Sequence, residues 1–416
     1  MDVADEMETS DDSFNLLDIR PVHDFNALFM ESESQGKGTW PCMEPIRMPM
    51  DLENCEFRTV ANQKFDDKVF KVPAHNKRKD LIKDVVKTHV LPFLPAKSLL
   101  KFKSVSKEWD QWISSPLLAH QQSFSFQKIS GYFCQHEDSY SKFFSLDGSA
   151  YGVPCPFLQF LPGDKRVLGS CNGLLLCQCS ESYYVCNPTT GDWKMLPSSV
   201  YYHGFDPAVV LAFEPSLQNI EAYYQVICAF SMFGSPVIYF DIYSSATRSW
   251  RCSDAICIEL GDSSLKGAGF YMNGSAYWET SSGQVLAFNV QNEEHGIISL
   301  PSEAAKGGTF TQVGDELCYV TVSNHSMNVS TIDIYGGLDM SLKRSISLNL
   351  ELSYFPECKV LPGVDGDKLL ILTRNGQLCL LSYNLSDQNV ELLCKPRGVG
   401  FNFRFLPYIN SLACVT

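Results

Sequence analysis

Apolar and polar residues follow three different patterns along this chain of 416 residues. In residues 1–76 the apolar positions show neither the period of a strand nor that of a helix. Residues 77–123 have helical spacing, whereas residues 124–416 consist of short apolar runs separated by turns rich in Gly, Ser and Asx. The pattern predicts a disordered acidic leader over 1–76, a small helical domain over 77–123 and an all-β domain over 124–416.

Three short helices are expected in the helical segment. Leu81 and Val85 recur at helical spacing in the first, and Pro95 suits the start of the second because it fixes φ and has no N–H to lose. Ser106 is a natural N-cap for the third, which Ser114–Pro116 should end. Three helices of this length bury little apolar surface by themselves, so some of their apolar side chains are expected to dock elsewhere.

A repeat organises the β-rich remainder. Six apolar runs reach an Asx residue that is expected to open a polar turn, at Asp147, Asn187, Asp241, Asn289, Asp333 and Asn384. Successive marks lie 40 to 54 residues apart, and about four strands fit in each interval, which is the size of a propeller blade. The repeat predicts a β-propeller of about six blades.

The C-terminal segment 401–415 has strand character but no Asx turn after it. We expect it to close the ring by pairing with the first blade near residues 124–146, which removes exposed sheet edges. A β-sandwich is the structural alternative, although a sandwich would not naturally repeat one signature six times.

The net charge of −14 is distributed unevenly. Residues 1–56 carry −11, residues 57–110 carry +7 and residues 111–416 carry −10. The lysines of the basic region alternate with apolar residues, as on a solvated helix face, which disfavours nucleic-acid binding. The acidic leader remains open to two interpretations, a solvating segment or a partner-binding arm.

The sequence lacks the common signatures of metal sites and enzymes. No C-x-x-C pair occurs among its 16 cysteines, and no G-x-S-x-G, H-E-x-x-H, P-loop or dinucleotide motif is found. We therefore predict no metal, no cofactor and no catalytic residues. The N-terminus has no secretory pattern and no apolar run is long enough to span a bilayer, so a cytoplasmic or nuclear protein with free thiols is expected.

Residues 94–116, LPAKSLLKFKSVSKEWDQWISSP, resemble an F-box of the plant type. The resemblance implies docking onto the Skp-type adaptor of a cullin–RING ubiquitin ligase. The expected adaptor-binding residues are Leu94, Pro95, Ser98, Leu99, Val105 and Trp109. The alternative for Trp109 and Leu100 is that they form the core of the small helical domain itself.

Residues 169–197, GSCNGLLLCQCSESYYVCNPTTGDWKMLP, resemble the opening of the F-box-associated, kelch-related domain of plant F-box proteins, and PYINSLACV resembles its ending. Together the resemblances imply a non-catalytic substrate-recognition subunit of an SCF-type (Skp–cullin–F-box) ubiquitin ligase. Its partners would be the adaptor, through it the cullin and RING subunits, and an unknown protein target on the propeller, with no nucleic acid and no membrane.

Two further hypotheses stay open beside this one. A propeller enzyme or small-molecule-responsive receptor would need a deep polar pocket in the central channel. A ligase-independent scaffold would lack adaptor binding. Two aromatic turns are candidates for target contact, Tyr201-Tyr202-His203 and Tyr354-Phe355-Pro356, unless they pack under neighbouring blades.

Overall fold

The computed structural model describes residues 74–136, 141–146, 152–232, 235–301, 307–326, 329–337, 339–349, 357–363 and 366–416. The chain divides into two compact units, residues 1–83 and 84–416. The predicted acidic leader lies outside the described residues except for its last three. No helix in the described part of the chain is long and apolar enough to cross a membrane.

The helical segment contains α2 (Ala74–His89), the 3₁₀ helix η1 (Leu91–Phe93), α3 (Ala96–Phe102), α4 (Lys107–Ile113) and α5 (Pro116–Ser125). Pro95 is the residue before α3, and Ser106 caps α4 by accepting a hydrogen bond from the Trp109 N–H at 3.2 Å. The expectation of three helices is confirmed only in part, because α5 was not predicted. Ser115 and Pro116 end α4 and also begin α5, with Ser115 as its N-cap.

The strands form six antiparallel sheets in the described residues. The first contains β1 (Ile129–Gln135), β2 (Lys142–Ser145) and β23 (Arg404–Ile409); the second contains β3 (Arg166–Cys171), β4 (Leu174–Cys179), β5 (Ser182–Cys186) and β6 (Trp193–Met195). The third contains β7 (Ala208–Ala212), β8 (Gln225–Ser231), β9 (Ile238–Ser244) and β10 (Ser249–Cys257); the fourth contains β11 (Phe270–Met272), β12 (Ser275–Glu279), β13 (Gln284–Asn289) and β14 (Glu294–Ser299). The fifth contains β15 (Thr309–Val313), β16 (Glu316–Ser326), β17 (Val329–Gly336) and β18 (Ser341–Asn349); the sixth contains β19 (Glu357–Leu361), β20 (Lys368–Asn375), β21 (Gln377–Asn384) and β22 (Val390–Cys394).

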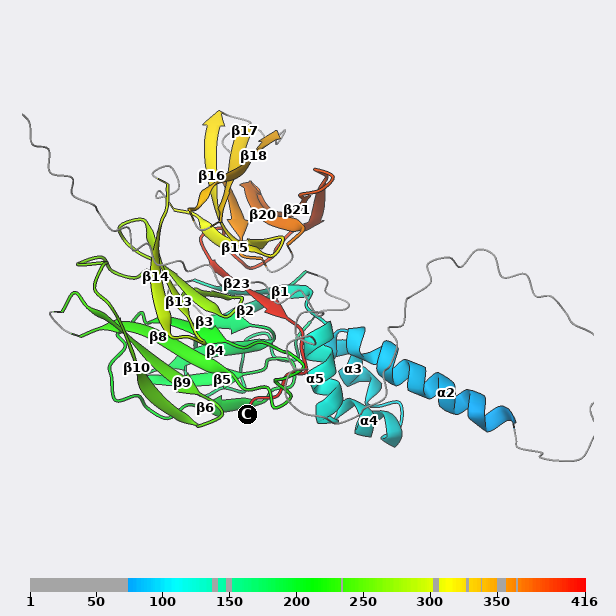
Figure 1. The fold of residues 1–416 in the computed structure, drawn as a ribbon. Helices are drawn as coiled ribbons and strands as arrows, with labels where there is room; N and C mark the ends of the chain where they lie inside the picture. Colours follow the sequence, from blue (N-terminus) through cyan, green and yellow to red (C-terminus); the bar gives the residue numbers. More distant parts are fainter. Residues whose placement is uncertain are drawn as a thin grey trace, which may run out of the picture. The chain divides into compact units, whose positions relative to one another are not determined.

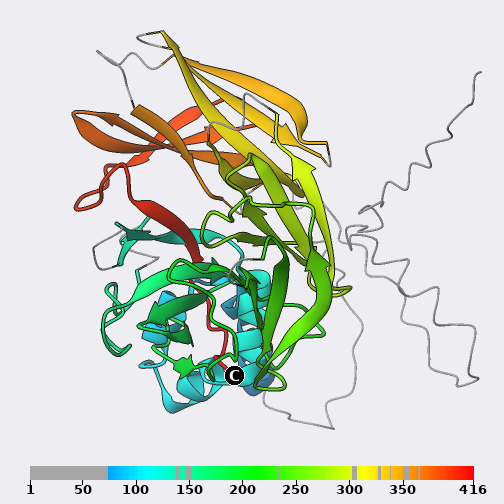
Figure 2. The ribbon, with the colours of Figure 1, turned by 90° about the vertical axis from the view of Figure 1, so that its left-hand side faces the viewer.

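These sheets are the blades of a six-bladed propeller, which confirms the fold predicted from the repeat. Six apolar clusters lie between neighbouring sheets: five join each sheet to the next, and the sixth joins the last sheet to the first. Because most blades are covered by neighbours on both faces, an inner strand such as β7 is buried along its whole length. Figures 1 and 2 show the sheets following one another in chain order, with β23 returning to β1.

The C-terminal strand closes the ring as predicted. β23 pairs antiparallel with β1, with Phe133 opposite Leu406 and Gln135 opposite Arg404. The first sheet therefore combines the first and last strands of the propeller. This closure also places the residues after β23 beside α5, where Gln122 binds the Asn410 carbonyl (Figure 1).

The Asx marks lie at the third strand of their blades, but not all of them open turns. Asn187 directly follows β5, and Asn289 and Asn384 end β13 and β21. Asp241 instead lies inside β9, opposite Cys228 of β8 on one side and Cys252 of β10 on the other. Asp333 lies inside β17, opposite Thr321 of β16. The expectation of a turn at these two positions was wrong. Each of these carboxylates accepts hydrogen bonds from side chains, which stabilises it within a strand. The mark at Asp147 lies outside the described residues.

Candidate functional site

The residues predicted to bind an adaptor differ widely in exposure. Leu99 is fully buried in the core of the helical segment, and Leu94 and Trp109 pack half-buried against that core. Pro95 and Ser98 are half-buried at the start of α3. Val105 is the exposed member of the set, with 61% of its surface accessible. The structure contains no partner, so the binding roles themselves stay predictions.

Three exposed apolar residues lie on or close to α3 in the sequence. Phe93, Phe102 and Val105 are all exposed, and we call these three residues the α3 apolar surface. The half-buried Trp109 ring packs edge-on against Phe102, with 5.8 Å between the ring centroids. Exposed apolar side chains that are held in place by a packed aromatic ring are suited to contact with another protein.

The core of the helical segment is completed by the far end of the chain. Leu412, in the C-terminal tail that follows β23 (residues 410–416), is buried with Leu91, Ala96, Leu99, Ile113, Leu118 and Ala119. Gln122 of α5 fixes the tail: its Oε1 accepts from the Leu412 N–H at 2.8 Å and its Nε2 donates to the Asn410 carbonyl at 3.1 Å. The tail therefore contributes Leu412 to the core of the helical segment, while other apolar side chains of that segment stay exposed.

The two sequence signatures of the propeller hold the same tail. Asn187 Nδ2 donates to the carbonyls of Ser411 and Ala413 at 3.0 and 2.8 Å. Thr189 Oγ1 donates to Asn410 Oδ1 at 2.9 Å. Gly173 has φ +93°, and a Cβ there would lie 2.3 Å from the Ser411 Cβ. These buried hydrogen bonds fix the tail to the second blade, so α5 and the propeller are hydrogen-bonded to the same C-terminal tail.

The propeller has two distinct faces. The first strands of neighbouring blades contact one another around the channel, and β23 takes the place of a first strand in its sheet. β23 begins at Arg404 and ends next to the tail, and β3 begins at Arg166 and ends near Gly173. Strands of six residues span about 20 Å. Helices α3 to α5 therefore lie where β3 and β23 end, and among the described residues after 83 they do not cover the opposite face, where these strands begin.

A loop rich in aromatic residues, Ser198–Asp206, lies on this opposite face. His203 is buried, with Nε2 3.0 Å from Asp241 Oδ2 and Nδ1 3.2 Å from the Tyr183 hydroxyl. The Ser199 hydroxyl donates to the same Asp241 oxygen at 2.5 Å, and the Tyr201 ring lies 4.9 Å from that of Phe230. Buried polar contacts at both ends therefore hold the loop in one conformation.

The outer side of this loop is exposed. Val200, Tyr202 and Phe205 are 90%, 74% and 86% accessible. Beside them runs a groove of about 1040 Å³ whose lining includes Tyr202, Phe230, Met232, Pro236, Ile238 and Leu265. Of the predicted aromatic turn, Tyr202 thus faces solvent while Tyr201 and His203 pack inward. The second turn, Tyr354-Phe355-Pro356, lies outside the described residues.

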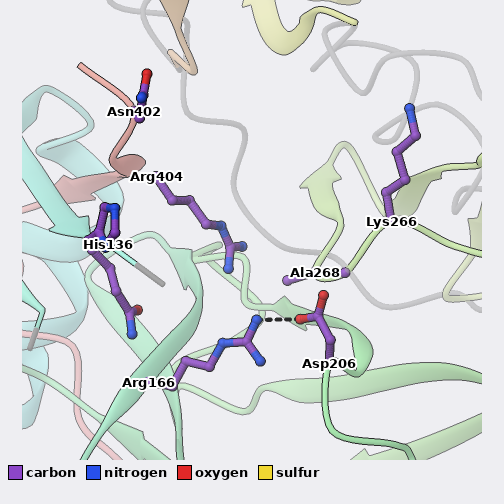
Figure 3. A pocket seen from close by; sticks show the side chains of 9 residues that line it. His136, Arg166, Asp206, Lys266, Ala268, Asn402 and Arg404 are labelled. Carbon is purple, nitrogen blue, oxygen red and sulfur yellow. Dashed lines mark hydrogen bonds and ion pairs between the residues drawn. The ribbon is translucent and has the colours of Figure 1, made fainter. Parts of the chain in front are cut away.

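The groove adjoins a polar pocket at the mouth of the channel, with Asp206 lining both. This channel mouth has a volume of about 240 Å³ and is lined by Arg166, Arg404, Lys266, His136, Asn402 and Asp206, among others (Figure 3). Arg166 forms an ion pair with Asp206, and Lys266 forms one with Glu279. Arg404 donates instead to the Leu168 carbonyl at 2.7 Å. Burial, together with the neighbouring Arg166, lowers the pKa of Arg404 to about 10.

One group of potential metal ligands occurs among the described residues, Cys257, Glu259 and His295. His295 Nε2 is 3.2 Å from Glu259 Oε2, so two of the three side chains already bind each other. Burial raises the pKa of the Cys257 thiol to about 11, which keeps it protonated near neutral pH. In the structure His295 of β14 and Glu259, which follows β10, form a hydrogen-bonded contact between two blades.

Sequence reasoning did not find the residues of the channel mouth. Arg166, Asp206 and Arg404 belong to three different blades and have no common spacing. They meet because each lies at or just before the start of an inner strand. The one available signal was the predicted ring closure, which implies that residue 404 returns to the first blades.

Comparison with known proteins identifies related chains. Residues 164–335 match the family model described as the F-box associated beta propeller domain. The Arabidopsis thaliana F-box protein At5g07610 is 31% identical over 320 residues, covering 66% of this chain and 72% of that protein. F-box protein At5g49610 of the same plant is 30% identical over 252 residues, covering 56% and 68%. Among solved structures, Porphyromonas gingivalis dipeptidyl peptidase 4 has a TM-score of 0.34 at 8% identity, over 64% of this chain and 44% of that chain, which is too low to carry an argument.

Proposed function

Because the chain belongs to the plant F-box proteins with a C-terminal F-box-associated β-propeller domain, we propose that it is the substrate receptor of an SCF-type ubiquitin ligase. In this role the α3 apolar surface binds a Skp-type adaptor, and through it the cullin and RING subunits. The face with the groove and the channel mouth binds a protein target. The receptor itself carries out no chemistry, and it acts in the cytoplasm, the nucleus or both.

The observation that carries this proposal is the shared C-terminal tail. Gln122 binds the tail from the helical side, and Asn187 binds it from the propeller side. A rigid connection fixes the distance and direction between the adaptor surface and the target surface. Ubiquitin transfer by proximity depends on that geometry, because holding two reactants in place makes their encounter effectively intramolecular.

Co-purification with a Skp-type adaptor tests the first half. Val105→Asp places a charge on the exposed adaptor surface and should abolish co-purification, because a carboxylate cannot be buried there without a partner. Leu99→Asp is unsuitable, since Leu99 is part of the core and its replacement disturbs folding. The matched control is Val200→Asp, the same substitution on the opposite face.

The two variants have opposite expected outcomes. Val105→Asp should lose the adaptor and keep its target, whereas Val200→Asp should keep the adaptor and lose its target, measured by mass spectrometry of proteins captured with the tagged full chain. If both variants retain the adaptor as the wild type does, the adaptor-binding assignment is wrong. A wild-type chain that captures no adaptor identifies the protein as a ligase-independent scaffold instead.

A further inference from the structure

We propose that the channel mouth binds a carboxylate side chain, an Asp or Glu of the target protein, while an apolar side chain of the same segment occupies the adjoining groove. This inference rests on the proposed function, because it names the class of target for the same face.

Of the three arginine and lysine side chains that line the mouth, Arg404 is the one that forms no ion pair with a carboxylate. Its guanidinium donates to the main-chain carbonyls of Val167 and Leu168, which satisfy hydrogen-bonding groups but not the charge. The nearby cation Arg166 is already paired with Asp206. Burial and, to a smaller extent, Arg166 disfavour the charged form of Arg404 and lower its pKa, and the opposite effect of Asp206 does not cancel them.

The charge of the mouth matches a monoanion. Arg166, Lys266 and Arg404 supply three positive charges, while Asp206 and Glu279 supply two negative ones. One carboxylate therefore makes the site neutral, whereas a phosphoryl group with nearly two negative charges would leave an excess of negative charge beside Asp206. A guanidinium also binds a carboxylate with two parallel hydrogen bonds, which adds orientation to the attraction.

The groove supplies the second half of the recognition. It shares Asp206 with the channel mouth, so a single extended segment can reach both. Its exposed side chains, among them Tyr202 and Met232, offer apolar and polarizable contacts. Tyrosine and methionine are both enriched in protein interfaces, and tyrosine combines a large contact area with a small loss of conformational freedom.

Peptide pools test the proposal without knowledge of the target. The full chain, purified with its adaptor, is applied to randomised decapeptides that carry one fixed central residue: Glu, Gln or phosphoserine. The wild type should bind the Glu pool about tenfold better than the Gln pool, since a charge-assisted hydrogen bond contributes somewhat more than the 1.4 kcal/mol that a factor of ten requires. The phosphoserine pool should bind no better than the Glu pool.

Three variants assign the preference to the mouth. Arg404→Gln should remove it, whereas Arg251→Gln, which removes an exposed guanidinium paired with Glu293 outside the mouth, should leave it unchanged. Asp206→Asn raises the local charge by one unit and should change the preference from Glu to phosphoserine. A new preference for phosphoserine cannot arise from misfolding, so Asp206→Asn still tests the proposal if Arg404→Gln is unstable.

Several results would overturn the proposal. Equal binding of the Glu and Gln pools by the wild type shows that the mouth does not read charge, and a wild-type preference for phosphoserine assigns it to another anion. A synthetic peptide of residues 1–56 that displaces the Glu pool would make the acidic leader of this chain the occupant. Adaptor co-purification is scored separately, so failure of the proposed ligase role remains distinguishable from failure of carboxylate recognition.

Discussion

Replacing Gln122 should separate the helical segment from the propeller. This fully buried side chain makes three hydrogen bonds to main-chain groups: from Leu412 N–H at 2.8 Å, to the Asn410 carbonyl at 3.1 Å and to the Leu94 carbonyl at 3.2 Å. Gln122→Leu keeps most of the volume and removes all three bonds. The substitution therefore tests the polar connection with little contribution from a cavity.

The expected magnitude follows from the groups left without partners. A buried main-chain donor or acceptor that loses its partner costs about 1–3 kcal/mol, so the stranded Leu412 N–H and the weakened carbonyls together should lower the free energy of unfolding by about 2–5 kcal/mol. That is a large fraction of the about 5–15 kcal/mol that stabilises a typical domain. Gln121→Leu is the matched control, because Gln121 is the half-buried neighbour on the same helix, and surface changes of this kind stay within about 0.5 kcal/mol.

Urea unfolding followed by circular dichroism measures the loss, and hydrogen exchange with mass spectrometry locates it. In Gln122→Leu, amides of α3, α4, α5 and residues 410–416 should exchange faster, while β7 and β8 keep their protection, because local opening follows the connection that was broken. Equal unfolding free energies for the Gln122 and Gln121 variants, with unchanged exchange in the tail, would refute the reasoning.

Two further predictions concern the loop 198–206 and the buried thiols. Asp241→Ala removes the acceptor of the Ser199 and His203 hydrogen bonds, so the amides of residues 198–206 should exchange at least about tenfold faster. Adaptor co-purification should stay at the wild-type level. An unchanged exchange rate would show that aromatic packing alone holds the loop. Burial raises the pKa of the Cys134 and Cys358 thiols from 9.0 to about 12, so the folded state retains protons that the unfolded state loses above pH 9. The unfolding free energy should therefore fall as the pH rises from 9 towards 12, by about 1.4 kcal/mol per unit and thiol. Burial lowers the pKa of Lys359 to about 8, so this group raises the unfolding free energy as the pH rises from 8 to 10.5. Lys359→Met should therefore make the urea midpoint fall more steeply with pH. Midpoints that stay level above pH 9 in both proteins would contradict the raised thiol pKa values.

The helical segment shows where local sequence reasoning succeeds and where it stops. Ser106 was expected to cap α4 and does so, because capping depends on residues three positions apart. Ser115 and Pro116 were interpreted only as the end of one helix, although the same pair begins α5. The F-box resemblance implied Leu99 as an adaptor-binding residue, and the structure places it in the core, since the spacing of a motif does not reveal which face of a short helix will be covered.

The propeller shows the same division on a larger scale. Its six blades, and the pairing of β23 from the predicted closing segment 401–415 with the first blade, followed from a repeated pattern of apolar runs, which each blade carries within its own 40 to 54 residues. The strand position of Asp241 and Asp333 did not follow, because it depends on pairing with neighbouring strands and on side chains such as Ser199 that approach from outside the strand.

The sequence by itself determined the order of the modules, the number of blades and the closure of the ring, because each of these depends on the spacing of apolar and turn residues along short stretches of chain. Only the tertiary structure decided that Leu412 completes the core of the helices and that Arg166, Asp206 and Arg404 form one pocket. Gln122 and Leu412 are 290 residues apart. Such contacts arise from how the ring closes in space, and no local period encodes them.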